Sequence, residues 1–142
     1  MEHQTIEHHT AALVTVRSAK GQLWQDKLRK STGEIVELNF SNISETLEEG
    51  EEPLDAAVRG IQEELGLSIH PTRFCFSKTE DVRKMSPTKG YLKDYTFHHF
   101  DIWLHADETA AACLQVEENS GIVYLEWRPI SAQMPNLQKS SN

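Results

Sequence analysis

The chain is poor in the residues that mark secreted or membrane-spanning proteins. It has two cysteines in 142 residues, Cys75 and Cys113, which give no disulfide framework and no multi-cysteine zinc site. No apolar run approaches the roughly 20 residues that cross a bilayer. The first ten residues lack the basic and apolar regions of a signal peptide and the Arg-rich character of a transit peptide. We therefore expect a cytoplasmic protein, in a reducing compartment and without a membrane anchor.

Positive charge is scarce as well. Fourteen Lys and Arg residues face 22 Asp and Glu residues, for a formal net charge of −8. This balance disfavours an extended nucleic-acid partner, which requires a basic surface. It is compatible with a small phosphorylated ligand, because bound divalent cations reverse the local charge of an acidic site. The segment 45–55 has six acids and no base, and a solvated loop is the ordinary interpretation of such a run.

The pattern of apolar residues and turn residues predicts one mixed α/β (α+β) domain with helices packed on a sheet. Its core spans about residues 10–134, and its ends are expected to fray. A polar segment, 81–94, is long enough for a lid or specificity loop. A short last helix is expected to begin at Pro129. Strands are predicted over 10–17, 22–29, 34–40, 72–79, 95–104 and 121–127.

A helix from Pro53 to Leu65 is the clearest element. Proline suits the first helical turn, and Gly66 stands where a left-handed C-terminal cap is expected. The opposite flank of this helix is polar, and Gly60 interrupts it at an exposed interior position, which costs about 1 kcal/mol relative to alanine. An apolar stripe at helical spacing is formed by Leu54, Ala57, Val58, Ile61 and Leu65. The polar flank comprises Arg59, Gly60, Glu63 and Glu64.

This loop and helix resemble the signature of the Nudix hydrolase family. The family pattern is Gly-x5-Glu-x7-Arg-Glu-U-x-Glu-Glu-x-Gly-U, where U is a bulky aliphatic residue. The flanking stretch "YLEWRPIS" is similar to a Trp-containing strand and turn near the C-terminus of family members. The resemblance implies a mixed β-sheet sandwiched between helices. The matching positions are Glu51, Arg59, Ile61, Glu63, Glu64, Gly66 and Leu67.

The resemblance also implies a function. Family members are metal-dependent hydrolases, so we expect cleavage of the pyrophosphate bond of a nucleoside diphosphate linked to another group, with Mg²⁺ or Mn²⁺. It implies that Glu63 and Glu64 bind the metal and that Arg59 and Glu51 form an orienting pair. A homodimer would be unsurprising. The bland alternative for Arg59 is a solvated surface pair with Glu63, worth a few tenths of a kcal/mol.

Two positions depart from the signature. Glu45 stands where its first glycine belongs, and Gly60 stands where the glutamate after arginine belongs. Three interpretations of Gly60 stay open: another residue supplies the base, the glycine makes room for a ligand or water, or the chemistry has been lost. The alternative function is therefore a catalytically impaired Nudix-fold module that binds or regulates. Glu45 could itself supply an oxygen ligand.

Further candidates lie outside the signature. Glu117 or Glu118 could supply another acidic ligand, and Tyr91, in the polar segment 81–94, is the most plausible substrate contact. His98 and His99 are strand neighbours that point to opposite faces and cannot chelate together. Two expectations concern packing rather than chemistry: Trp103 is placed in the core, and both cysteines are expected to be small buried residues.

Overall fold

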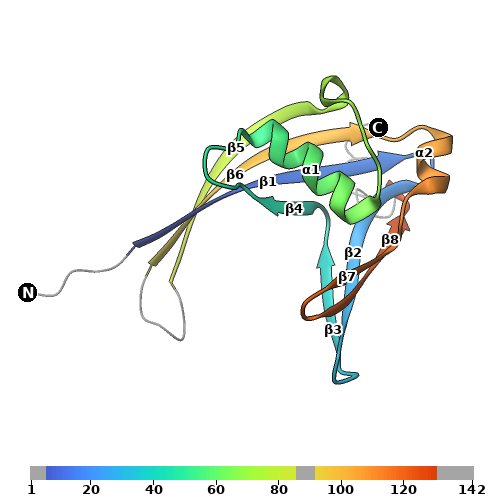
Figure 1. Ribbon diagram of the computed structural model, residues 1–142, viewed down its shortest axis with the longest axis horizontal. Helices are drawn as coiled ribbons and strands as arrows, with labels where there is room; N and C mark the ends of the chain where they lie inside the picture. The colour runs from blue at the N-terminus through green and yellow to red at the C-terminus, as the bar shows by residue number, and fades with distance from the viewer. Residues whose placement is uncertain (1–5, 86–91, 131–142) are drawn as a thin grey trace, which may run out of the picture.

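A single mixed sheet of eight strands organises the protein (Figure 1). The computed structural model describes residues 6–85 and 92–130. The strands are β1 (Ile6–Ser18), β2 (Gly21–Lys30), β3 (Ile35–Phe40), β4 (Ile43–Thr46), β5 (Cys75–Met85), β6 (Leu92–Trp103), β7 (Gln115–Glu118) and β8 (Gly121–Arg128). The helices are α1 (Pro53–Leu65), α2 (Ala106–Ala111) and a 3-10 turn, η1 (Pro71–Arg73).

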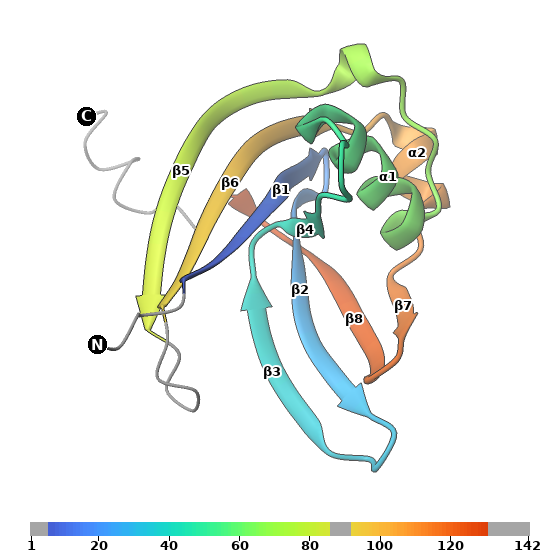
Figure 2. The same ribbon diagram turned by 60° about the vertical axis from the view of Figure 1, so that its left-hand side comes forward.

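Strand β1 joins the two parts of the sheet. On one side it runs parallel to β6 from Ile6 to Arg17, and β6 continues to β5 at the edge. On its other side it pairs first with β4 and then, at its C-terminal end, with β2. Strand β2 leads on to β3 and β8, and β8 to β7 (Figure 2). Strands β1 and β2, which cover the predicted strands 10–17 and 22–29, form an antiparallel hairpin.

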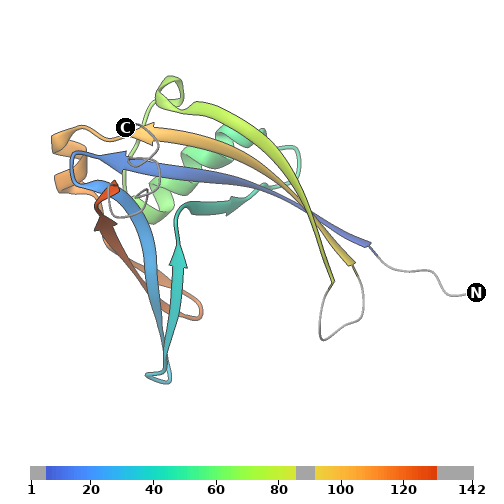
Figure 3. The same ribbon diagram turned by 180° about the vertical axis from the view of Figure 1, so that it is seen from behind.

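Helix α1 covers one face of the sheet where β1 and β4 meet. Seen from behind, the strands β1, β5 and β6 lie in front of the helix (Figure 3). Its bounds are those predicted, and Gly66 adopts the expected left-handed conformation, with φ 70°. Of its apolar stripe, Ala57, Ile61 and Leu65 are fully buried, and Leu54 and Val58 are partly buried. The core beneath it also includes Val14, Val16, Leu23, Ile43, Phe100, Ile102, Leu104, Val123 and Leu125.

The prediction of a polar loop over 81–94 was wrong where the structure describes it. Residues 81–85 belong to β5 and 92–94 to β6, while 86–91 lie outside the described residues. Charged and polar residues predominate in this part of the two strands, and Val82, Met85 and Leu92 are too few to give a clear alternating pattern. Cross-strand contacts stabilise it instead: the Arg83 guanidinium donates to both carboxylate oxygens of Asp94, at 2.6 and 2.9 Å, and Thr96 donates to Asp81.

The short elements β4, β7 and α2 were not predicted, and the helix expected after Pro129 falls mostly outside the described residues. Two packing expectations were wrong. Trp103 is 53% exposed, because strand alternation turns its neighbour Ile102 into the core. Cys75 and Cys113 are exposed as well. No helix in the described ranges is long and apolar enough to cross a membrane.

Candidate active site

Arg59 ties the outer flank of α1 to the acidic segment that precedes it. Its Nε and Nη2 donate to the two carboxylate oxygens of Glu51, at 3.1 and 2.9 Å. One Glu51 oxygen also accepts the backbone N–H of Glu48, at 2.9 Å. These hydrogen bonds, those from Arg59 first, lower the pKa of Glu51. The two-pronged contact fixes the helix against the loop, as an arginine fork does with a carboxylate.

Glu45 is the second carboxylate held by Arg59. Its Oε1 accepts a hydrogen bond of 2.6 Å from Nη1, and the carbonyl of its neighbour Thr46 accepts one of 2.9 Å from Nη2. Glu45 lies on β4 two residues after the buried Ile43, so alternation turns both side chains toward α1. Burial raises the pKa of Glu45, against the hydrogen bond from Arg59, which lowers it.

Gly60 is buried, and Glu45 is what covers it. A Cβ at position 60 would lie 3.0 Å from Glu45 Cβ and 3.4 Å from Glu45 Oε2. The expectation of an exposed helix position was therefore wrong. The glycine makes room for a side chain of the same protein. A glycine inside a helix costs about 1 kcal/mol relative to alanine, and here a larger side chain would collide with Glu45.

Glu63 and Glu64 occupy the rest of the flank. Glu63 is 54% exposed and accepts a longer contact of 3.3 Å from Arg59 Nη1, one helical turn away. Both the orienting pair and the surface pair expected from the sequence are thus present, and the Glu51 contact is the shorter. Burial raises the pKa of Glu64 to about 7, and the charges of Glu118, Glu45 and Glu63 add to the effect.

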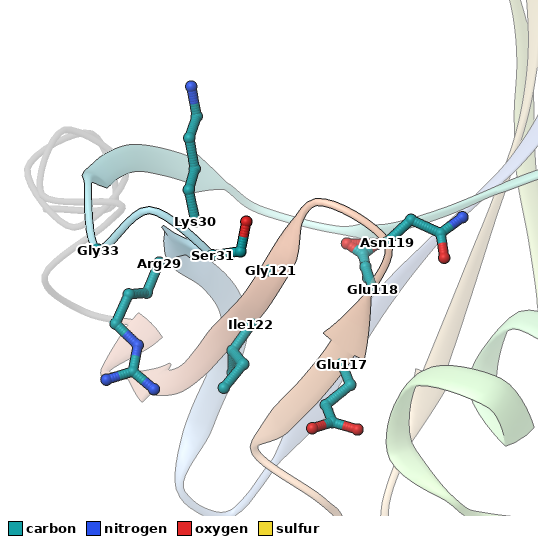
Figure 4. A pocket seen from close by; sticks show the side chains of 9 residues that line it. All are labelled: Arg29, Lys30, Ser31, Gly33, Glu117, Glu118, Asn119, Gly121 and Ile122. Carbon is teal, nitrogen blue, oxygen red and sulfur yellow. The ribbon is translucent and has the colours of Figure 1, made fainter.

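Glu117 and Glu118 lie on β7, beside a pocket of about 460 Å³. Figure 4 shows their carboxylates on different sides of the strand, with Arg29 and Lys30 of β2 also at this pocket. Of the two candidates, Glu118 is the one whose charge raises the pKa of Glu64. Glu118 is thus the link between the pocket and the helix flank, and the link is electrostatic, because the residues that line the pocket come from β2, β7, β8 and their turns and not from α1.

The oxygen donors at this flank suit a hard divalent cation such as Mg²⁺ or Mn²⁺, because all are glutamate carboxylates. Within residues 6–85 and 92–130, however, no three His, Cys, Asp or Glu side chains converge as a ready-made metal cluster. Arg59 engages Glu45, Glu51 and Glu63 instead. His98 and His99 turn to different partners, Thr79 and Glu80, as strand alternation requires. Tyr91 lies outside the described residues.

Comparison with known proteins agrees with this fold and signature. The NUDIX domain family matches residues 7–139, and the chain belongs to that family. No curated protein sequence matches it significantly. Among solved structures, it is similar to a NUDIX hydrolase from Nitrosomonas europaea, with 16% identity, a TM-score of 0.53 and coverage of 93% of this chain and 79% of the other.

A MutT/nudix family protein from Enterococcus faecalis is similar too. It has 10% identity and a TM-score of 0.52, over 89% of this chain and 45% of that one. At sequence identities this low, the similarity to these two structures shows a shared fold and nothing more. Both have a mixed sheet and helix arrangement that this chain shares, as the signature predicted.

Glu45 has a larger part in the site than the sequence indicated. Glu45 was noted as a departure and a possible ligand, but its position over Gly60 was not foreseen. The signal was present: the two departures from the signature are reciprocal, a glutamate for a glycine at 45 and a glycine for a glutamate at 60. A reciprocal change at two positions suggests that they share a space.

Proposed function

We propose that the chain is a Nudix hydrolase that cleaves the pyrophosphate bond of a nucleoside diphosphate linked to another group, in a reaction dependent on Mg²⁺ or Mn²⁺. The observation that carries the proposal is the helix flank. Arg59 is anchored on Glu51, and the adjacent carboxylates Glu63 and Glu64 lie one turn further along α1. A homodimer and a cytoplasmic location stay predictions.

The flank has more negative charge than its own guanidinium can compensate. Arg59 contacts three carboxylates, and Glu64 is crowded by further acids. A phosphorylated ligand would be repelled by such a surface unless cations intervened. A bound Mg²⁺ or Mn²⁺ would neutralise phosphate oxygens and lower the pKa of an attacking water. Glu63 and Glu64 would hold that cation.

The remaining residues act by position. The contact between Arg59 and Glu51 holds the acidic segment against α1 and so fixes the position of the segment relative to the helix. The pocket between β2 and the β7–β8 turn contains Glu118, whose charge acts on Glu64, and it offers one of the strand neighbours Arg29 and Lys30 as a cationic contact for a phosphorylated substrate. We assign substrate binding to this pocket, with Tyr91 a further predicted contact.

Hydrolysis is tested directly. Purified protein with Mg²⁺ or Mn²⁺ is incubated with nucleotide sugars, ADP-ribose, dinucleoside polyphosphates and nucleoside triphosphates, and released nucleotide and phosphate are measured. We expect turnover of at least one diphosphate-linked compound. Glu64→Gln should abolish it, and Glu49→Gln, which removes an exposed acid of the segment 45–55, should not. A wild type inactive on the whole panel, or an active Glu64→Gln variant, contradicts the proposal.

Binding without turnover is the second candidate. It is favoured by Gly60, which has no side chain to bind metal or accept a proton at the position where the signature has a glutamate. Under this candidate, a substrate analogue would bind in the presence of Mn²⁺ with no product formed. Calorimetric titration of the same panel separates the two candidates.

A further inference from the structure

Strand β5 forms one edge of the sheet. It pairs with β6 on its inner side, and no strand of residues 6–85 and 92–130 pairs with its outer side. Figure 2 shows it as the outermost strand of this part of the sheet, and in Figure 1 the far ends of β1, β5 and β6 extend beyond α1. The unpaired N–H and C=O groups of an edge strand are a template for a further strand.

The charges on this edge have a self-complementary order. Two acids are followed, after one valine, by two bases: Glu80, Asp81, Val82, Arg83 and Lys84. The side chains of Asp81, Arg83 and Lys84 are exposed, and those of Glu80 and Val82 are half-buried. Charges of a single sign would keep two such edges apart, because like charges that face each other are destabilising. Here both signs are present, and reversing the strand exchanges acids with bases.

Symmetry restricts how two copies of β5 can pair. A two-fold axis perpendicular to the sheet makes the strands antiparallel and keeps each side chain on its own face, so one residue faces its own copy. With Val82 on the axis, Glu80 faces Lys84 of the second copy. Asp81 then faces Arg83, and each pair occurs twice. An axis at any of the four charged positions instead places two like charges directly opposite each other, which is destabilising.

The axis at Val82 also suits the regular part of the strand. Pairing about this residue extends from Thr79 to Met85 and avoids the irregularity that lies between Phe76 and Lys78. An axis at Thr79 would avoid like charges too. It would give each copy one acid–base pair in place of two, and the pairing would run into the irregularity. Charge and backbone regularity therefore select the same register.

The contacts that these side chains make within the β5–β6 ribbon leave them available to a second copy. Arg83 donates to Asp94 through Nε and Nη2, and within the described ranges its Nη1 makes no hydrogen bond. That nitrogen remains for Asp81 of the second copy. Glu80 contacts His99 through Oε1, at 2.9 Å, and its other oxygen remains for Lys84.

We propose that the chain forms a homodimer through the outer edges of β5, with the two strands antiparallel and Val82 on the two-fold axis, so that the two sheets become continuous. The contact is short, so the dimer is reversible and its population depends on protein concentration over the micromolar range. The proposal is independent of the proposed function, because β5 contributes no residue to the site on α1.

Sedimentation velocity of the full chain, from micromolar to submillimolar concentration, tests the charge pattern. Glu80→Lys/Asp81→Lys leaves bases alone on the edge and should weaken self-association about tenfold or more, and Arg83→Glu/Lys84→Glu, which leaves acids alone, should do the same. Glu37→Lys/Glu49→Lys changes the net charge as the first variant does, at exposed acids outside β5, and should change affinity less than about threefold. A wild type that stays monomeric, or edge variants that dimerise as it does, would overturn the inference.

Mixing the two edge variants gives a second arm. The bases of one then face the acids of the other at all four positions, so the mixture should form a heterodimer although each variant alone is monomeric. Combining the four substitutions in one chain reverses the order of the charges and should restore self-association to within about threefold of wild type. No association in the mixture, or a folded reversed variant that is monomeric, would contradict the pairing.

Crosslinking tests the register. In a background of Cys75→Ser/Cys113→Ser, Val82→Cys puts two thiols directly opposite each other, whereas Thr79→Cys separates them by about 20 Å along the strands. A short bismaleimide should therefore link the Val82→Cys copies and leave the Thr79→Cys copies unlinked. Equal crosslinking of the two would overturn the inference. If circular dichroism shows that a charge variant does not fold, this comparison decides.

Discussion

Two arginines tie helices to their surroundings in this protein, and their settings differ. Arg73 of η1 donates to both oxygens of Glu108 on α2, each at 2.7 Å, and to the carbonyl of Trp103 at 2.9 Å. One guanidinium there meets one carboxylate. Arg59 is similarly exposed, at 24% against 27% for Arg73, but it meets three carboxylates.

The acids around Arg59 do not all respond alike: its hydrogen bonds lower the pKa of Glu51, whereas burial raises the pKa of Glu45 and of Glu64. The hydrogen bonds from Arg73 hold the pKa of Glu108 at about 2. Burial and, after it, the charges of neighbouring acids raise the pKa of Glu64, on the same flank of α1 as Arg59, to about 7. A balanced pair stabilises the fold and leaves no charge to attract a ligand. Where carboxylates outnumber the guanidinium, as around Arg59, their mutual repulsion reduces the stability of the fold. The uncompensated negative charge is what a cation site requires.

The largest expected effect comes from removing the arginine of the surplus site. Arg59→Met leaves three crowded acids without their counter-charge and should lower the free energy of unfolding by about 2 kcal/mol, a figure between exposed and buried ion pairs because the side chain is partly solvated. Arg73→Met strands a single acid and should cost about 1 kcal/mol. Urea denaturation in EDTA measures both. If both variants lost the same free energy of unfolding, the excess of carboxylates around Arg59 would have no effect on stability.

The balanced pair should give the second largest effect, in a pH-dependent form. The folded pKa of Glu108, about 2, lies below the ordinary 4.5, so its contribution is complete above pH 4.5 and is lost as pH falls toward 2. After allowance for solvent screening, we expect Glu108→Gln to cost about 1 kcal/mol at pH 6 and almost nothing near pH 2.5. Denaturation of wild type and variant across this range measures the difference. A cost independent of pH would show that packing or capping, rather than charge, is what Glu108 contributes.

The features that could be predicted from the sequence are those with local signals. Helix α1 was predicted at both ends because its signals are local: Pro53 at the start, Gly66 at the end and an apolar stripe between them. Arg59 and Glu51 were paired correctly through the family signature, whose fixed spacing crosses only one loop and two turns of helix. The role of the site residues was not testable in this way and stays a prediction.

Contacts between residues far apart in the chain could not be predicted from the sequence. The orientation of Glu45 follows from the register of β4 against β1, in which Glu45 pairs with Ala12. A strand of four residues has too short an alternating pattern for that pairing to be predicted from the sequence. The charge of Glu118, which acts on Glu64, comes from β7, an equally short strand. Strands were predicted over 72–79 and 95–104, but the distal ends of β5 and β6, within 81–94, were interpreted as a loop because charged and polar residues predominate there.

The smallest expected effect on stability separates folding from binding at the surplus site. Glu63 is 54% exposed, and its contact with Arg59 is the longest of that guanidinium's side-chain contacts, at 3.3 Å. Glu63→Gln should therefore change the free energy of unfolding by less than about 0.5 kcal/mol, since the lost pair is offset by relief of repulsion from the neighbouring acids.

The same variant should weaken Mn²⁺ binding about tenfold, because one of the proposed ligands is gone. Glu108→Gln should do the reverse, lowering stability while leaving Mn²⁺ affinity unchanged. Denaturation in EDTA and Mn²⁺ titration of the two variants, side by side, give four numbers. If Glu63→Gln destabilised the fold as much as Glu108→Gln and left Mn²⁺ affinity intact, the two arginine sites would be of one kind, and the carboxylate surplus at α1 would have no part in binding.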